Sequence, residues 1–393
     1  MVELRGAWLV GCVLGFAGVA SGGDFADFVV SYVPAPGQFI NGEVSDGSSF
    51  NDPSAALGPP TGGGLVSPDN SGVVTLGGFG GEIVLGFDET VEDDPLNPMG
   101  IDAIVYGNAF WVGSSGEVRW AEAGVIEISL DVNRNGLADD AWYVIPGSDI
   151  DGENPLGVFE VMVWDDDPGT AVPPLDVSLY PDPLLYPGIG SSYETGGFRL
   201  PLVFDGLTLS NAASDEPGVV ERYWGYADVS PTLELGDVDA DGVVEDAGVD
   251  PGVFYTRPDN RYEVGVSGGS GGGDGFDIGE AVDPATGERA GLRGFDFVRI
   301  RTASGVAVGV FGEKSVEVDA VADVRPVEPS DFDVDGDGAL TVEDLYAFYG
   351  LRDAQDLAAD LNGDRVVDLV DRDLLEGAVR RGEAADIAGG FGR

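Results

Sequence analysis

The sequence predicts a mainly β fold: an antiparallel β-sandwich or jelly roll with long loop insertions, followed by a small all-α module at the C-terminus. Three observations support this fold class. The 393 residues include 63 Gly and 24 Pro, which indicates many turns and short strands. Short runs of β-branched and aromatic residues recur between these turns with almost no helical periodicity. From about residue 331 onward, apolar residues recur at helical spacing instead.

The N-terminal residues 1–22 have the pattern of a secretory signal peptide. Arg5 precedes an apolar run, and the small residues around Ala20 would permit cleavage. An alternative is a lipoprotein-type signal, in which Cys12 would carry a lipid anchor. Both alternatives predict an exported protein that is secreted, extracellular or held at the cell surface. No later segment offers about 20 uninterrupted apolar residues, so we expect no transmembrane helix.

The middle region, residues 24–325, consists of short candidate strands separated by Gly, Asp and Pro. The candidate strands are residues 73–76, 82–87, 102–106, 125–130, 142–145, 159–164, 295–302 and 306–311. Charged and apolar side chains alternate within residues 295–301, as in a strand with one buried face. Strands at this spacing predict an antiparallel sandwich. The region is long for one sandwich, so residues 165–220 and 230–275 are expected to be loop insertions.

The charge and the missing residue types restrict the function. The chain carries 71 acidic and 19 basic residues, a formal net charge of −52. Such a surface repels phosphate backbones, so no nucleic-acid partner is expected, although a salt-adapted acidic proteome is an alternative cause of the charge. No His occurs, which excludes Ser-His-Asp and Cys-His catalytic pairs and His-ligated zinc. Since Cys12 is the only Cys, a metal must be held by oxygen, which favours calcium or magnesium.

A regular spacing of acidic residues is clearest in the C-terminal region, residues 331–380. In the stretches that begin at Asp333 and Asp360, side-chain oxygens occur at loop positions 1, 3, 5 and 12. Calcium takes roughly six to eight oxygen ligands, and a tight loop followed by a helix can provide them. The spacing therefore predicts calcium as the cofactor and two calcium loops in this region.

Two looser versions of the spacing lie in the middle region, each with Gly at position 6. The candidate ligands are Asp131, Asn133, Asn135, Leu137 and Asp139 in the first loop, and Asp237, Asp239, Asp241, Val243 and Glu245 in the second. Trp142 and Gly248 stand at position 12, so neither loop has a closing carboxylate there. We expect calcium loops that brace strand connections. The alternative is an acidic turn without an ion, because Asp, Asn and Gly favour turns.

Several segments of the middle region resemble a family of bacterial cell-surface proteins. They are residues 28–39, 51–60, 76–87, 105–110, 131–143, 276–283 and 295–302. The resemblance covers nearly the whole middle region in order. It implies a calcium-dependent jelly roll similar to galactose-binding and discoidin-like modules, with no assured activity.

The duplicated loop–helix arrangement of residues 331–380 resembles a type I dockerin, an EF-hand-like module that attaches secreted proteins to cohesin domains. The ligands that this resemblance implies are Asp333, Asp335, Asp337, the Ala339 carbonyl, Thr341 and Asp344 in the first loop, and Asp360, Asn362, Asp364, the Val366 carbonyl, Asp368 and Asp371 in the second. Arg365 replaces Gly at position 6 of the second loop, which should weaken that site. Residues 342–343 and 369–370 occupy the positions at which dockerins carry Ser/Thr contacts to a cohesin, but they contain no Ser or Thr. The module could therefore bind a partner other than a cohesin.

The apolar pattern predicts that the two halves of this module pack together. The residues expected on the packed faces are Leu345, Phe348 and Tyr349, then Leu374, Leu375, Ala378 and Val379, with Leu340 and Val367 between the loops. Such small halves bury little surface separately, so calcium should drive their folding. Residues 326–330 are expected to form a linker and residues 381–393 a flexible tail.

The sequence thus predicts a secreted or cell-surface calcium-binding protein that is not an enzyme and attaches to a cohesin-like or other protein partner. One alternative is a glycoside hydrolase, the only plausible enzyme class, because two carboxylates suffice for its chemistry. Glu122, Glu127 and Glu221 lie near aromatic residues, but the chain is so acidic that such neighbours have little weight.

A second alternative is a carbohydrate-binding protein. Trp111 and Trp120 flank a polar loop and are the tryptophans expected to be exposed, where a ring could stack on a sugar. Packing of both rings in the sandwich core is the competing interpretation.

Overall fold

The computed structural model describes most of the middle region and part of the C-terminal region. The described residues are 23–34, 50–77, 81–94, 97–112, 118–148, 223–261, 265–302, 315–326, 332, 334–335, 339–354, 359, 361, 367, 369, 371–372 and 375–380. For residues 160–165, 192–197, 208–210, 212–213 and 220–221 it gives the strand backbone alone. The predicted signal peptide, the tail, residues 327–330 of the linker and the predicted strand 306–311 lie outside the described residues.

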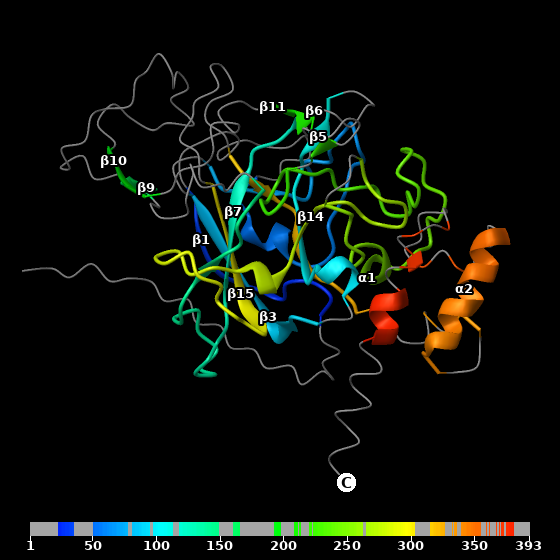
Figure 1. The fold of residues 1–393 in the computed structure, drawn as a ribbon. Coiled ribbons are helices and arrows are strands. Elements are labelled where there is room, and N and C mark those ends of the chain that lie inside the picture. The colour runs from blue at the N-terminus through cyan, green and yellow to red at the C-terminus, as the bar shows by residue number, and fades with distance from the viewer. Residues whose placement is uncertain are drawn as a thin grey trace, which may run out of the picture.

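The largest sheet has five antiparallel strands in the order β1-β3-β15-β7-β8 (Figure 1). Their bounds are Phe28–Val33 for β1, Glu82–Glu92 for β3, Gly294–Thr302 for β15, Gly124–Ser129 for β7 and Tyr143–Val144 for β8. In the centre of this sheet Ile300 pairs with Ile83 on one side and Ile126 on the other. All three side chains are fully buried, because alternate residues of each strand point to the same face.

A second antiparallel sheet has the order β14-β4-β17, with bounds Asp274–Phe276, Ala103–Tyr106 and Ala320–Asp323. Its central strand β4 is buried on both faces. Ala103 and Val105 pack in the same core as the five-stranded sheet, whereas Ile104 and Tyr106 pack in a second core. The second core also contains Phe254 and Tyr255, from α1 (Pro251–Phe254) and the residue after it. The three-stranded sheet is therefore the middle layer of this part of the molecule.

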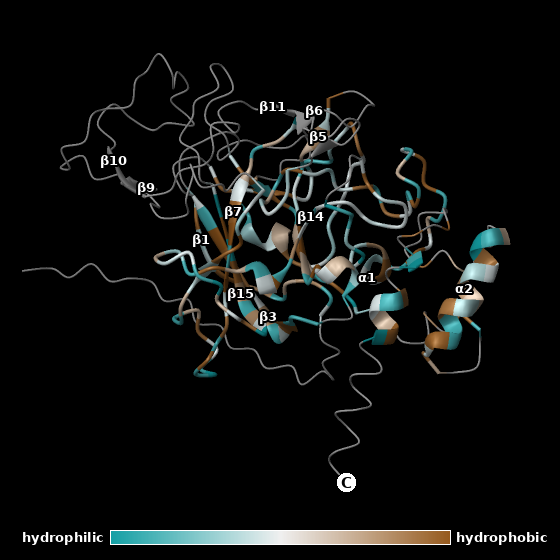
Figure 2. Cartoon of the chain, viewed as in Figure 1, coloured by the Kyte–Doolittle hydropathy of each residue, from teal (hydrophilic) through white to brown (hydrophobic). Residues whose placement is uncertain are grey.

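Aromatic side chains join the two sheets. The ring of Phe295 in β15 lies 5.7 Å from that of Phe87 in β3 and 5.9 Å from that of Phe276 in β14. Hydrophobic residues, drawn in brown, accordingly concentrate along β7 and β15 in Figure 2. One shared core thus connects strands that are nearly 200 residues apart in the sequence.

The remaining elements are short. The strands are β2 (Val74–Thr75), β5 (Phe110–Trp111), β6 (Val118–Trp120), β9 (Glu160–Asp165), β10 (Ser192–Gly197), β11 (Thr208–Ser210), β12 (Ala212–Ala213), β13 (Val220–Glu221) and β16 (Glu317–Val318). The helices are η1 (Pro53–Ala56), η2 (Pro98–Gly100), η4 (Ile278–Glu280) and α2 (Val342–Ala354). Asp52, Asp250 and Asp277 cap η1, α1 and η4 by accepting a backbone N–H two residues ahead.

The prediction of a mainly β fold with antiparallel sheets is confirmed. Each predicted strand within the described residues overlaps a strand of the structure, namely β2, β3, β4, β7, β8, β9 and β15. The sequence interpretation missed β1, β14, β16 and β17, among others. β14 lies in a Gly-rich stretch, and β16 and β17 alternate acidic with small or aliphatic residues, so neither pattern predicts a buried strand. Within the described residues, no helix is long and apolar enough to span a membrane.

The charged residues of β15 lie on the outer face of the five-stranded sheet, as the alternation predicts. Arg299 makes two hydrogen bonds to the Glu127 carboxylate, at 2.7 and 2.8 Å. Its guanidinium also lies 4.3 Å from the ring centre of Trp142. Arg301 bridges to Glu82 at 2.9 Å. Because each of these arginines is paired with a glutamate, this face of the sheet carries charged side chains without an isolated buried charge.

The C-terminal region has its own apolar cluster. It contains Phe332, Phe348, Ala359, Val367, Leu375, Ala378 and Val379, with Leu340 and Leu345 packed against it. The side chains come from α2, from the helical residues 375–380 and from the segments between. The prediction for Tyr349 is wrong, because 43% of this residue is exposed. Leu374 lies outside the described residues.

Replacement Ile126→Val should lower the free energy of unfolding by about 1 kcal/mol, because it removes one methylene from a fully buried site in the shared core. Urea denaturation of the full chain would measure this change. Val132→Ala is the matched control, since Val132 is 71% exposed and should change stability by less than about 0.5 kcal/mol. Equal effects at the two sites would contradict the described core.

Candidate functional site

The acidic loop that begins at Asp237 brings three carboxylates together. Oxygen atoms of Asp237, Asp239 and Glu245 all lie within 4.8 Å of one another. Asp237 is 1% exposed, whereas Asp239 and Glu245 are exposed. Three of the five predicted ligands of this loop therefore face one small volume that could hold a cation.

Backbone hydrogen bonds hold the loop around Asp237. Its carboxylate accepts the N–H groups of Asp241 at 3.1 Å and Gly242 at 3.0 Å. Asp241 in turn accepts the N–H of Val243 at 2.9 Å. Ala240 and Gly242 have positive φ angles of 57° and 86°, which turns the chain sharply at positions 4 and 6. The side chain of Asp241 is thus used inside the loop rather than in the three-carboxylate group.

The loop that begins at Asp131 has the same backbone pattern. Asp131 accepts the N–H groups of Asn135 at 3.0 Å and Gly136 at 2.6 Å, and Asn135 accepts that of Leu137 at 2.8 Å. Arg134 and Gly136 have φ angles of 56° and 72°. The predicted equivalence of the two loops therefore extends to their backbone conformation.

The two loops differ in charge. Positions 3 and 5 of the first loop are Asn133 and Asn135, and both side-chain amides donate to Asp139 at 3.2–3.4 Å. The first loop has two carboxylates at its predicted side-chain positions and the second loop has four, so the first loop offers a cation less negative charge. It is therefore the weaker of the two candidate sites.

Burial and neighbouring charges disfavour the ionised form of Asp237. Burial raises the pKa of its carboxyl, the hydrogen bonds from Gly242 and Asp241 oppose this rise, and the charges of Glu245 and Asp241 add to it. A divalent cation among these carboxylates would offset both the burial and the repulsion.

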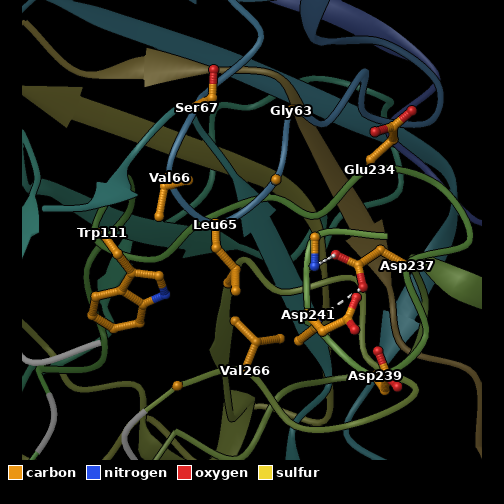
Figure 3. A pocket seen from close by; sticks show the side chains of 14 residues that line it. Gly63, Leu65, Val66, Ser67, Trp111, Glu234, Asp237, Asp239, Asp241 and Val266 are labelled. Carbon is orange, nitrogen blue, oxygen red and sulfur yellow. Dashed lines mark hydrogen bonds between the residues drawn. The ribbon is translucent and has the colours of Figure 1, made fainter. Parts of the chain in front are cut away.

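A pocket of about 540 Å³ adjoins this loop. It is lined by Gly63, Gly64, Leu65, Val66, Ser67, Trp111, Glu234, Asp237, Asp239, Ala240, Asp241, Gly242, Gly265 and Val266. Figure 3 shows Trp111 at one end and the three aspartates at the other, with Leu65 and Val266 between them. One wall therefore offers carboxylate oxygens, and the other is apolar.

The predicted exposure of Trp111 is wrong. The residue is 3% exposed, and the guanidinium of Arg119 lies 5.3 Å from its ring centre. Trp120 is half-buried and stacks on Phe110 with ring centres 6.0 Å apart. Trp111 is thus buried, as the competing interpretation requires, although it lines the pocket, whereas Trp120 is only partly buried.

Of the glutamates considered for catalysis, the two whose side chains are described, Glu122 and Glu127, do not line this pocket. Glu122 is 4% exposed and accepts the Ser315 N–H at 3.1 Å, beside the carboxyl of Glu317, which is 1% exposed. Glu127 is paired with Arg299. The side chain of Glu221 lies outside the described residues. The described glutamates therefore serve internal contacts in this conformation.

The closing aspartates of the C-terminal loops are fully buried. Asp344 accepts the N–H groups of Thr341 at 2.7 Å and Asp335 at 3.2 Å. Asp371 accepts the N–H of Leu361 at 2.7 Å. Each carboxylate thus reaches back to the start of its own loop. The predicted ligands that lie outside the described residues are Asp333, Asp337, Asp360, Asn362, Asp364, Val366 and Asp368.

The comparisons with known proteins do not assign a family. No protein-family model matches the chain, and no curated protein matches it significantly. The dockerin and jelly-roll resemblances therefore stay predictions, and the function has to be argued from the residues of the chain itself.

A second group of three carboxylates was not predicted from the sequence. Asp93, Asp102 and Asp277 also offer oxygens within 4.8 Å of one another. They lie up to 184 positions apart (277 − 93), so no local spacing could have predicted their meeting.

Proposed function

We propose that this chain is a calcium-binding, non-catalytic protein of the cell surface or extracellular space. The observation that carries the proposal is the grouping of Asp237, Asp239 and Glu245 on a loop whose spacing predicts a calcium site. Calcium would neutralise these carboxylates and fix the loop between the strands. Three carboxylates and the predicted carbonyl of Val243 fall short of the roughly six to eight oxygens that calcium takes, so water or a ligand would complete the shell.

The proposal extends to the fold and the attachment of the protein. The two sheets that share one core fit a jelly roll with loop insertions, and the C-terminal apolar cluster fits a dockerin-like module. Buried Asp344 and Asp371 support two calcium loops that close at position 12. Such a module would attach the protein to a cohesin-like domain or to another protein partner.

A second candidate function is carbohydrate binding at the pocket beside the Asp237 loop. The observation that favours it is the pairing of an oxygen-rich wall with an apolar wall formed by Leu65, Val66 and Val266. Sugars present hydroxyl groups and apolar ring faces, and these match the two walls. A glycan array on the calcium-loaded chain tests this function. Product analysis on the same samples tests the hydrolase alternative, which would gain support from cleavage that one Glu→Gln change abolishes.

Replacement Asp239→Asn should weaken calcium binding at this loop by roughly tenfold or more, because it removes one negative charge from the ligand group. Isothermal titration calorimetry of the full, calcium-stripped chain measures the affinity. Asp246→Asn is the matched control: it lies in the same segment, and its carboxylate accepts the Gly248 N–H at 3.0 Å outside the three-carboxylate group. Identical calcium isotherms for the wild type and Asp239→Asn would refute the site.

A further inference from the structure

Three strand ends bring Asp93, Asp102 and Asp277 into contact. Asp93 follows β3, Asp102 precedes β4, and Asp277 follows β14. Their carboxylate oxygens lie within 4.8 Å of one another. This group lies outside both acidic loops of the middle region and shares no residue with them.

Hydrogen bonds fix the position of each member. Asp102 is 1% exposed and accepts the Ile278 N–H at 2.8 Å. Asp277 accepts the Gly279 N–H at 2.6 Å as the cap of η4. The backbone N–H of Asp93 donates to the carbonyl of Arg293 at 3.0 Å. Backbone N–H groups therefore hold the carboxylates of Asp102 and Asp277, and the main chain of Asp93 is fixed beside them.

An unsatisfied amide oxygen accompanies the carboxylates. Asn97 is 4% exposed, and its Nδ2 donates to Asp102 Oδ1 at 2.8 Å. Its Oδ1 is buried and accepts no hydrogen bond. Because both atoms belong to one amide group, Oδ1 lies next to the Nδ2 atom that contacts the Asp102 carboxylate. A buried oxygen without a donor is costly, and a cation would satisfy it.

The surrounding charge also favours a cation. In the described part of the chain, no arginine forms an ion pair with Asp93, Asp102 or Asp277. Arg261 acts on Asp277 at longer range, but its guanidinium binds the Glu280 carboxylate at 2.6 and 2.9 Å. Asp323 interacts electrostatically with Asp102 and is a further acidic side chain beside the group.

We propose that Asp93, Asp102, Asp277 and the side-chain oxygen of Asn97 form a calcium site. The site would tie the β3–β4 connection to the turn after β14, and thus brace the edge where the two sheets meet. Hard carboxylate and amide oxygens without nitrogen or sulfur ligands favour calcium over transition metals. The irregular arrangement of the ligands suits calcium better than magnesium, which requires near-octahedral geometry.

The test counts the calcium ions bound by the full chain after removal of divalent ions. Equilibrium dialysis against calcium, followed by elemental analysis, should give one ion fewer for Asp102→Asn and for Asp277→Asn than for the wild type. Both changes keep an oxygen that accepts the N–H of Ile278 or Gly279, so the variants should fold. Asp88→Asn, at an exposed position of β3, is the matched control and should bind as many ions as the wild type.

Two further variants keep the outcomes distinct. Asn97→Asp replaces the amide by a fourth carboxylate and should strengthen calcium binding, even if the other variants fold poorly. At a calcium concentration too low to fill the weakened Asp237 loop, Asp239→Asn should lose a different ion, so its combination with Asp102→Asn should lose two. An unchanged ion count in Asp102→Asn and Asp277→Asn, or an unchanged affinity in Asn97→Asp, would overturn the proposal while leaving the Asp237 loop untouched.

Discussion

Removal of calcium with excess chelator is expected to unfold residues 331–380 first and then to loosen the middle region. Asp344 and Asp371 are fully buried, and each would stand among other loop carboxylates. Without a cation, burial and repulsion oppose folding, and the apolar cluster of this region is small. The helix content should fall on addition of chelator and recover with calcium. Far-UV circular dichroism and hydrogen exchange of the full chain would measure both steps.

The control for this experiment is chelator saturated with calcium, which should leave helix content and exchange unchanged. Asp344→Asn should reproduce the loss in residues 331–380 while the sandwich stays protected. Identical exchange in the presence and absence of calcium would contradict a calcium-dependent module.

The calcium-free protein is expected to lose stability as pH rises from mildly acidic to alkaline. Burial raises the pKa of Asp228 and of Asp319 to about 7, against backbone hydrogen bonds that lower it. Burial, together with the charges of Glu122 and Asp228, raises the pKa of Glu317 well above its ordinary value. The folded protein therefore holds these protons more tightly than the unfolded chain.

The higher pKa values in the folded protein determine how its stability changes with pH. The stabilisation is fully present below the ordinary Asp value of 3.8 and is lost as pH rises through about 7. For Asp319 the loss is on the order of 4 kcal/mol. Urea midpoints at about pH 5 and about pH 8 should thus differ strongly.

Glu317→Gln tests the origin of the pH effect. The neutral amide cannot lose a proton, so this variant should depend less on pH and gain stability, relative to the wild type, as pH rises. Asp88→Asn, exposed on β3, should keep the wild-type dependence. A wild-type slope in Glu317→Gln, or greater stability of the wild type at alkaline pH, would contradict the role of the buried carboxyls.

The strands that could be predicted are those with a clear alternation. β3, β7 and β15 carry branched or aromatic residues on one face and charged residues on part of the other, so their period of two is visible in the sequence. β17 could not be predicted, because its Ala-Val-Ala-Asp stretch has no such contrast. Both of its faces are covered, and that follows from its position between two cores.

The sequence by itself determined the local part of the candidate site. Asp237, Asp239 and Glu245 lie in one short loop, and the hydrogen bonds to the Asp237 and Glu245 carboxylates join residues at most seven positions apart. The equivalent loop at Asp131 adopts the same turn for the same reason. Side chains this near to one another in the sequence can meet without contacts from the rest of the fold.

Only the tertiary structure decided what lies beside the loop. The pocket forms because residues 63–67 and Trp111 meet the loop across the fold, and burial of Trp111 follows from its packing against Arg119. Asp93, Asp102 and Asp277 meet because β3, β4 and β14 place their ends at one edge. Contacts between distant segments depend on the register and layering of the sheets, and a local spacing of residues carries no information about either.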